Sequence, residues 1–290
     1  MRSPWKTLQY RLEYLGFRLA GAFLTALPLE SASAFSGWLW RMIAPRLHRH
    51  RRALANLAAA FPLATLAERE KIATDMWDNL GRTFAEAFHL AGIAAGDRIL
   101  VEQPDIVEAL ARSGKGCVFC AGHLANWEVL VMPMLRIGIA PAGVYQKVKN
   151  PLIDANIRQT RAFLYTGGLY PKDRASARAL TRHAKAGGAA VLLADLRDWT
   201  GIKVPFFNRA APTTPFPATL ARLLDIPLVV ATLVRLPGVR FSIRLEQIMI
   251  ARSDDRDADI LAATSAVQAR LEQAVRAHPG QWMWGHRRWG

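Results

Sequence analysis

The second half of the chain alternates short apolar runs with helical patterns, and no other feature constrains the fold as strongly. Apolar runs occupy residues 116–121, 142–145, 189–194, 227–233 and 240–245. Helical patterns lie between or after them, at about residues 126–136, 151–165, 174–186, 215–224 and 256–277. Because strands that alternate with helices form a sheet covered by those helices, we predict an α/β fold with a mixed central sheet flanked by helices.

The first part of the chain carries only helical patterns. Residues 5–95 place apolar side chains three to four positions apart, as in Met76, Leu80, Phe84 and Phe88. The 290 residues are 51% apolar, which is enough for one large core. No internal repeat or low-complexity linker interrupts the sequence. We therefore predict an N-terminal membrane-anchoring helix at 1–28 and a single α/β domain at 29–290 whose first part is helical.

Residues 5–28 are rich in Leu, Phe, Ala and Tyr, but they carry too many charges to cross a bilayer. The apolar stretch after Arg18 is about ten residues long, whereas a spanning helix needs about 20. Arg11 and Arg18 share one helical stripe, and Lys6 and Glu13 share another. This pattern favours a helix that lies in the membrane interface. A cleaved secretory signal and a soluble core helix are the alternatives.

The chain is strongly basic, with 38 Lys and Arg against 23 acidic residues and a formal net charge of +15. Such a surface attracts nucleic acid, anionic lipid, phosphorylated substrates or an acidic carrier protein. The nine Trp favour a membrane interface among these partners. A basic cluster at residues 46–52 follows the N-terminal apolar region and adds attraction for anionic head groups.

Cys117 and Cys120 are the two cysteines, so their number excludes a disulfide framework. Both fall in a predicted strand, where a spacing of three directs the side chains to opposite faces. We predict two buried core residues. A metal site with His123 as third ligand lacks a second ligand pair of zinc-site spacing, and we predict neither a metal nor a cofactor.

Residues 122–128, with the sequence GHLANWE, carry the clearest chemical signal. His123 follows a predicted strand, and Asn126 can cap the next helix, which puts Glu128 in its first turn. His123 and Glu128 can then meet at the helix N-terminus. An imidazole oriented by a carboxylate is what a general base requires. The same two residues at this spacing also occur in purely structural roles, so the motif alone does not decide.

Further blocks follow in order: VYQK at 144–147, NPLID at 150–154, VPFF at 204–207 and PGQWMWGHRRW at 279–289. With the His-x4-Glu motif, they make the chain resemble the bacterial lipid A late acyltransferases. These are the lauroyl and myristoyl transferases of the lysophospholipid acyltransferase superfamily. The resemblance covers nearly the whole chain. It departs where Ala125, Leu196 and Asn208 stand in place of the family's common Gly, Gln and Gly.

The resemblance implies a role for each matching residue. His123 would take a proton from a substrate hydroxyl, and Glu128 would orient it. Arg161 would bind a phosphate or the developing oxyanion. Asp195 would hold Arg161 or line the acceptor site. The hydroxyl can attack a thioester directly, so no covalent acyl-enzyme is required.

Asn126 and Lys147 complete the predicted substrate-binding set, and Lys147 belongs to a basic rim that suits an acidic acyl carrier protein. Phe206 and Phe207 are expected in the core or in the wall of an acyl pocket. The closing Trp residues are core aromatics in one interpretation. In the other, the interleaved basic residues 286–288 place them at a membrane edge.

The function that the resemblance implies is transfer of a fatty acyl chain from an acyl carrier protein thioester to a hydroxyl of a membrane glycolipid. The expected acceptor is a lipid A precursor, at the cytoplasmic face of the inner membrane. Coenzyme A as donor stays open, as do a phosphatidylinositol mannoside, a lysophospholipid or an aminoacyl lipid as acceptor. The rival outside enzymes is a basic protein that binds membranes or nucleic acid, although we expect no nucleic acid among the partners.

Overall fold

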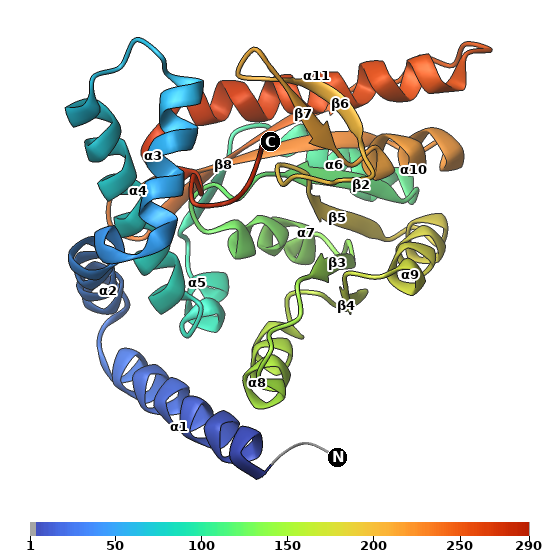
Figure 1. The fold of residues 1–290 in the computed structure, drawn as a ribbon. Helices are drawn as coiled ribbons and strands as arrows, with labels where there is room; N and C mark the ends of the chain where they lie inside the picture. Colours follow the sequence, from blue (N-terminus) through green and yellow to red (C-terminus); the bar gives the residue numbers. More distant parts are fainter. Residues whose placement is uncertain (1–3, 290) are drawn as a thin grey trace.

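The computed structural model describes residues 4–289, and its centre is a seven-stranded sheet with the order β1-β9-β8-β2-β5-β3-β4 (Figure 1). Its strands are β1 (Ile99–Val101), β2 (Cys117–Ala121), β3 (Pro141–Tyr145), β4 (Gly168–Pro171), β5 (Ala189–Leu193), β8 (Leu228–Leu236) and β9 (Arg240–Ile248). Only β8 and β9 pair in antiparallel fashion, so the sheet is mixed, as predicted. A separate antiparallel hairpin joins β6 (Ile202–Phe206) to β7 (Arg209–Thr213).

Helices cover both faces of this sheet. One face carries α3 (His48–Ala60), α4 (Leu66–Glu86), α9 (Arg174–Lys185), α10 (Phe216–Leu224) and α11 (Arg256–Ala277). The other face carries α5 (Leu90–Ala95), α6 (Pro104–Ser113), the 3-10 helix η2 (Trp127–Val131) and α7 (Met132–Arg136). The predicted α/β class with flanking helices is confirmed.

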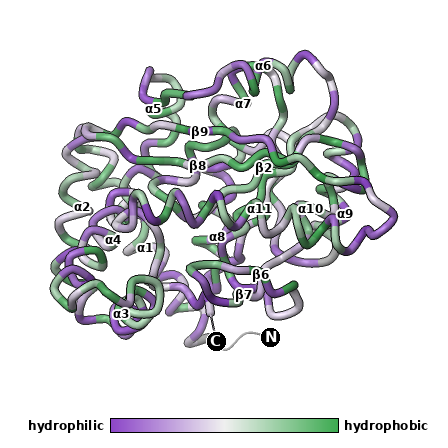
Figure 2. The backbone as a smooth tube through the Cα atoms, turned by 90° about the horizontal axis from the view of Figure 1, so that it is seen from above, coloured by the Kyte–Doolittle hydropathy of each residue, from purple (hydrophilic) through white to green (hydrophobic). Residues whose placement is uncertain are grey.

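The central strand β2 is buried along its whole length, which explains why its sequence is apolar throughout (Figure 2). Cys120 packs into the core on one face of the sheet, and Cys117 packs into the core on the other. Neither thiol forms a disulfide, and burial raises the pKa of Cys117 to about 12. The prediction of two core cysteines on opposite faces is confirmed.

The structure differs from the predicted elements where local signals are weak. The helix predicted at 126–136 is a 3-10 helix followed by one short α-helix, because Pro133 stands in the first turn of α7. The strands β1 and β4 were not predicted, since β1 has three residues and β4 contains both Gly and Pro. The hairpin of β6 and β7 was also missed, and each of its strands contains a proline.

Helix α1 (Pro4–Ala26) packs on the rest of the protein with one face, near α8 (Pro151–Arg161) and α2 (Leu29–Ile43). The rings of Phe17 and Phe88 lie 5.4 Å apart. Asn150 donates hydrogen bonds of 2.9 Å to the carbonyl of Tyr10 and to the carboxylate of Glu13. Between residues 4 and 289, no helix combines the length and the apolar character needed to cross a membrane. Residues 1–3 of the predicted segment 1–28 lie outside the described part of the chain.

The opposite face of α1 is apolar and exposed. Its side chains recur every three or four residues and are Trp5, Leu8, Leu12, Leu15, Leu19 and Phe23. The same surface continues on α2 through Phe35, Trp38, Met42 and Ile43. Ring contacts at 5.5 Å and 6.1 Å join Phe23 to Phe35 and Phe35 to Trp38. We call these residues the apolar surface of α1 and α2. Because α1 has apolar side chains on two faces, its sequence does not show a clean amphipathic pattern.

Candidate active site

His123 lies in the turn after β2, at the edge where the parallel strands end. Its Nδ1 is 2.8 Å from Asp195 Oδ1, and its backbone N–H donates to Asp195 Oδ2 at 2.6 Å. Asp195 follows β5, which pairs with β2 in parallel register, so both residues leave the sheet at the same edge. Because a carboxylate only accepts hydrogen bonds, Nδ1 donates to Asp195, and in the neutral imidazole the lone pair lies on Nε2.

Asp195 is 1% exposed, and its Oδ2 also accepts the indole N–H of Trp282 at 2.7 Å. Burial alone would raise the pKa of this carboxyl group. The charge of His123 and the hydrogen bonds from His123 and Trp282 outweigh burial and hold the pKa of Asp195 well below its usual range. Gly122 permits this approach, since a Cβ there would lie 3.2 Å from Oδ2. Asp195 is therefore a permanently ionised partner for the imidazole.

Glu128 takes a different partner from the one predicted. Its Oε1 pairs with Arg161 Nη2 at 2.9 Å, and no hydrogen bond joins it to His123 among residues 4–289. The expected contact of Glu128 with His123 is thus made by Asp195, and the expected contact of Asp195 with Arg161 is made by Glu128. The reason is local: the turn and the 3-10 helix after β2 bring Glu128 next to α8, while the pairing of β5 with β2 delivers Asp195 to the imidazole.

That turn is held by contacts with α4. Ala125 adopts the left-handed region at a φ of 48°, and its carbonyl accepts the Thr83 hydroxyl at 3.0 Å. Asn126 is fully buried, and its Oδ1 accepts the backbone N–H of Glu128 at 3.3 Å, the cap that the sequence predicts. Its amide group donates to Glu86 Oε2 at 2.9 Å. Both ends of Asn126 are therefore bonded to the protein itself, so it positions the loop of the site.

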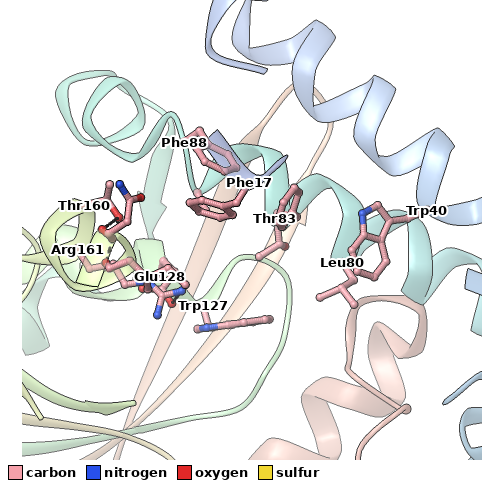
Figure 3. A pocket seen from close by; sticks show the side chains of 13 residues that line it. Phe17, Trp40, Leu80, Thr83, Phe88, Trp127, Glu128, Thr160 and Arg161 are labelled. Carbon is pink, nitrogen blue, oxygen red and sulfur yellow. Dashed lines mark hydrogen bonds and ion pairs between the residues drawn. The ribbon is translucent and has the colours of Figure 1, made fainter. Parts of the chain in front are cut away.

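An apolar pocket opens beside the Glu128–Arg161 pair (Figure 3). It is lined by Phe17, Trp40, Leu80, Thr83, Phe84, Ala87, Phe88, Trp127, Glu128, Asn156, Ile157, Thr160 and Arg161. Figure 3 shows the ion pair at one end, Trp40 and Leu80 at the other, and the rings of Phe17 and Phe88 between them. The pocket thus lies between α1, α2, α4 and α8, with its polar groups gathered at one end.

The pocket wall contacts His123, and the pocket lining includes a buried oxygen to which a ligand could donate a hydrogen bond. The Trp127 ring lies 5.0 Å from the His123 ring, so the pocket wall and the imidazole are in contact. Glu128 Oε2 is buried and makes no hydrogen bond to the described residues. A buried carboxylate oxygen without a donor costs free energy, so a ligand that supplies one would be favoured there.

The family model for bacterial lipid A biosynthesis acyltransferases matches residues 4–290. The chain belongs to this family. The match supports acyl transfer in lipid A biosynthesis as the general activity, with a lipid acceptor and an acyl donor. No curated protein sequence matches the chain.

In this acyltransferase the Trp- and Arg-rich C-terminal segment belongs to the core. Trp282 and Trp284 are 1% and 0% exposed, and their ring centroids lie 4.6 Å apart. Arg288 is 1% exposed and donates to Thr213 Oγ1 at 2.7 Å and Gln268 Oε1 at 2.9 Å. The core interpretation of these residues is confirmed and the membrane-edge interpretation is wrong. Phe206 and Phe207 are buried among the same rings, so they too are core.

One residue of the C-terminal segment reaches the site without having been predicted there. The His286 ring lies 5.4 Å from the His123 ring. Burial lowers the pKa of His286 to about 4, and the charges of His123, Arg49 and Arg52 add to this, against an opposing effect of Asp195. His286 is therefore a neutral imidazole at neutral pH. Its only signal in the sequence was its place between Gly285 and two arginines.

The remaining predicted residue stays apart from this group. Lys147 is exposed in the segment between β3 and α8, near Asp173 at the start of α9. The structure therefore brings together His123, Asp195, Glu128 and Arg161, but not Lys147. Across residues 4–289, no three His, Cys, Asp or Glu side chains gather in a way that could hold a metal ion.

Proposed function

We propose that this acyltransferase moves a fatty acyl chain from an acyl carrier protein thioester to a hydroxyl of a membrane glycolipid, a lipid A precursor, with His123 as general base. The single observation that carries the proposal is the hydrogen bond between His123 Nδ1 and buried Asp195 beside an apolar pocket. That arrangement combines a positioned base with space for a fatty chain.

The chemical step uses Nε2 of His123, the ring nitrogen that is not bonded to Asp195. The acceptor hydroxyl gives its proton to His123 Nε2 while its oxygen attacks the thioester carbonyl carbon. The new C–O bond forms, the C–S bond breaks, and the leaving thiolate takes the proton from the imidazolium. Asp195 keeps the Nδ1 proton in place and stabilises the imidazolium, as the third member of a triad does.

The Glu128–Arg161 pair serves the substrate in this proposal. Arg161 keeps 23% of its side chain exposed, so its guanidinium can donate to the thioester oxygen as negative charge develops there. The unbonded Oε2 of Glu128 can accept the hydrogen bond of a substrate hydroxyl. Both groups line the apolar pocket, which would hold the acyl chain between Phe17, Phe88 and Trp40.

We also propose that the apolar surface of α1 and α2 lies in the interface of the inner membrane, on its cytoplasmic face. Burying a single Leu or Phe side chain contributes roughly 1.5–3 kcal/mol, so a surface of this size favours a bilayer strongly. Exposed Arg41 in the last turn of α2 and exposed Arg46 just after it attract anionic head groups. Phe17 of α1 and Trp40 of α2 line the pocket, so a chain would pass from the bilayer into the site.

The test of the function is a transfer assay with purified protein, radiolabelled acyl carrier protein thioester and a lipid A precursor. We expect labelled glycolipid from the natural protein and none above background from His123→Ala. Label in another lipid of a membrane extract, with none in the lipid A precursor, would replace the proposed acceptor. Full transfer by His123→Ala would refute the mechanism. Salt-sensitive nucleic-acid binding without any transfer would favour the non-enzyme alternative.

The test of membrane binding is Leu12→Glu together with Leu19→Glu, both on the exposed face of α1. We expect recovery with anionic vesicles to fall at least tenfold, because two Leu side chains leave the bilayer and two negative charges approach it. Deletion of the whole helix is less informative, since it also removes Phe17 from the pocket. The control is Ala262→Glu with Gln273→Glu, which adds the same charge at exposed positions of α11. Equal recovery of both double variants would contradict the proposal.

A further inference from the structure

Three arginines from two distant parts of the chain lie near His286: the charges of Arg49 and Arg52 act on its ring, and Arg287 is the next residue. Arg49 and Arg52 lie on α3, and Arg287 follows His286 in the C-terminal segment, which runs beside α3 in Figure 1. Arg52 donates to the Gly285 carbonyl at 3.3 Å. A Cβ built on Gly285 would lie 3.8 Å from the Cβ of Arg49. We call Arg49, Arg52 and Arg287 the arginine cluster.

The arginine cluster is not neutralised by the protein. Within residues 4–289, none of its three guanidinium groups forms an ion pair with a carboxylate. Most buried or half-buried carboxylates of the chain instead pair with basic side chains outside the cluster. Two members of the cluster, Arg52 and Arg287, also lie close enough to Arg197 to affect its pKa. Burial lowers the pKa of Arg197, and Arg287 and Arg52 lower it further. Asp195 is the carboxylate whose charge acts on His286, and its oxygens already accept hydrogen bonds from His123 and Trp282.

The cluster adjoins the candidate active site. His286, which Arg287 follows, lies 5.4 Å from His123 between ring centroids, and Trp127 of the apolar pocket lies 5.0 Å from the same ring. The rings of Trp127 and His286 thus both lie next to the imidazole of His123. Like charges held together without a partner repel one another, and an anion bound between them removes that cost.

We propose that Arg49, Arg52 and Arg287 form a phosphate-binding site that places a phosphorylated substrate against His123. The inference rests on the proposed acyl transfer. Guanidinium groups present donors in a planar fork that matches phosphate oxygens, and they stay charged at any physiological pH. Neutral His286 adds a hydrogen-bonding nitrogen without further repulsion. The phosphate can belong to the acceptor glycolipid or to the phosphopantetheine arm of the acyl donor.

The experiment measures binding without turnover, so it is independent of the transfer assay. Four probes are titrated separately into the full-length protein in detergent: a phosphorylated glycolipid, its phosphatase-treated form, 4′-phosphopantetheine and pantetheine. The variant is Arg49→Gln with Arg52→Gln. The matched control is Arg51→Gln, which removes the same charge from an exposed position of α3 that points about 100° or more away from both. Arg287→Gln, an exposed position, is the second variant if the first does not fold.

We expect the double variant to lose about tenfold or more in affinity for one phosphorylated probe, and to bind the matching phosphate-free probe as the natural protein does. Arg51→Gln should bind all four probes normally. Loss for the glycolipid pair assigns the phosphate to the acceptor, and loss for the pantetheine pair assigns it to the donor. Unchanged affinity for both phosphorylated probes, or an equal loss in Arg51→Gln, would overturn the site. Transfer without phosphate discrimination would overturn this site alone and leave the proposed function standing.

Discussion

Two carboxylates lie close to the site, and they differ in how completely the protein satisfies them. Asp195 receives the Nδ1–H and the backbone N–H of His123 and the indole N–H of Trp282. Glu128 Oε1 pairs with the guanidinium of Arg161, and its Oε2 is buried without a hydrogen-bond donor among the described residues. Both side chains are nearly inaccessible, so burial alone does not separate them.

This difference distinguishes a carboxylate that positions a neighbouring side chain from one that binds a substrate. A carboxylate whose hydrogen-bonding capacity is filled by its own protein can fix a neighbour, but it has little left for a substrate. One with an unused buried oxygen carries an unmet cost that a ligand can relieve. We infer that Asp195 positions His123, while Glu128 with Arg161 meets the substrate in the apolar pocket.

The largest expected effect comes from breaking the saturated pair. We expect Asp195→Asn to lower kcat by about 10²–10⁴-fold with a small change in KM, because the amide can hold the imidazole in the wrong tautomer. Steady-state kinetics with the thioester donor measures this. Asp198→Asn, in the same segment after β5, is the control and should keep normal kcat. A normal kcat in Asp195→Asn would remove Asp195 from the mechanism.

Breaking the unsaturated pair should cost less and show in a different constant. We expect Glu128→Gln to lower kcat/KM for the acceptor by about 10–100-fold, since Arg161 loses its partner and the substrate loses an ionised acceptor. Glu246→Gln, which breaks an exposed pair with Arg270, is the control and should be neutral. A loss in kcat greater than that of Asp195→Asn would invert the comparison between the two carboxylates.

The smallest expected effect concerns the length of the acyl chain that the pocket beside Glu128 and Arg161 would hold. Thr160 is exposed on α8 and lines the pocket, so Thr160→Trp should fill pocket space without disturbing the core. We expect transfer of long acyl chains to fall severalfold relative to short ones, because each methylene that loses its place is worth about 0.8 kcal/mol. Competition between thioesters of two lengths measures the ratio. Ala155→Trp, exposed on the same helix but not lining the pocket, should leave it unchanged.

The fold was predictable because its signals are local. Apolar runs such as 117–121 and 189–193 mark buried strands, and helical periodicity marks the layers around them. Placing His123 at a strand end followed from the same reasoning. The short strand β1 and the proline-containing hairpin were missed because their residues lack such a pattern and are placed by tertiary pairing.

The partners inside the site were less predictable because they depend on sheet order. The residues His123 and Asp195 are separated by 72 positions, and they meet only because β2 and β5 are neighbours in the sheet. Spacing alone suggested Glu128, which lies close in sequence but faces α8. His286 was missed for the same reason, since nothing in residues 279–289 shows which strand end the segment crosses.

The most direct test of the account is whether Asp195 or Glu128 holds the imidazole of His123. Proton NMR of protein with 15N-labelled histidine reports the Nδ1–H of His123, which a hydrogen bond to a carboxylate moves far downfield. We predict that this resonance is present in the natural protein, persists in Glu128→Gln and disappears or moves upfield in Asp195→Asn. Its persistence in Asp195→Asn together with its loss in Glu128→Gln would contradict the account.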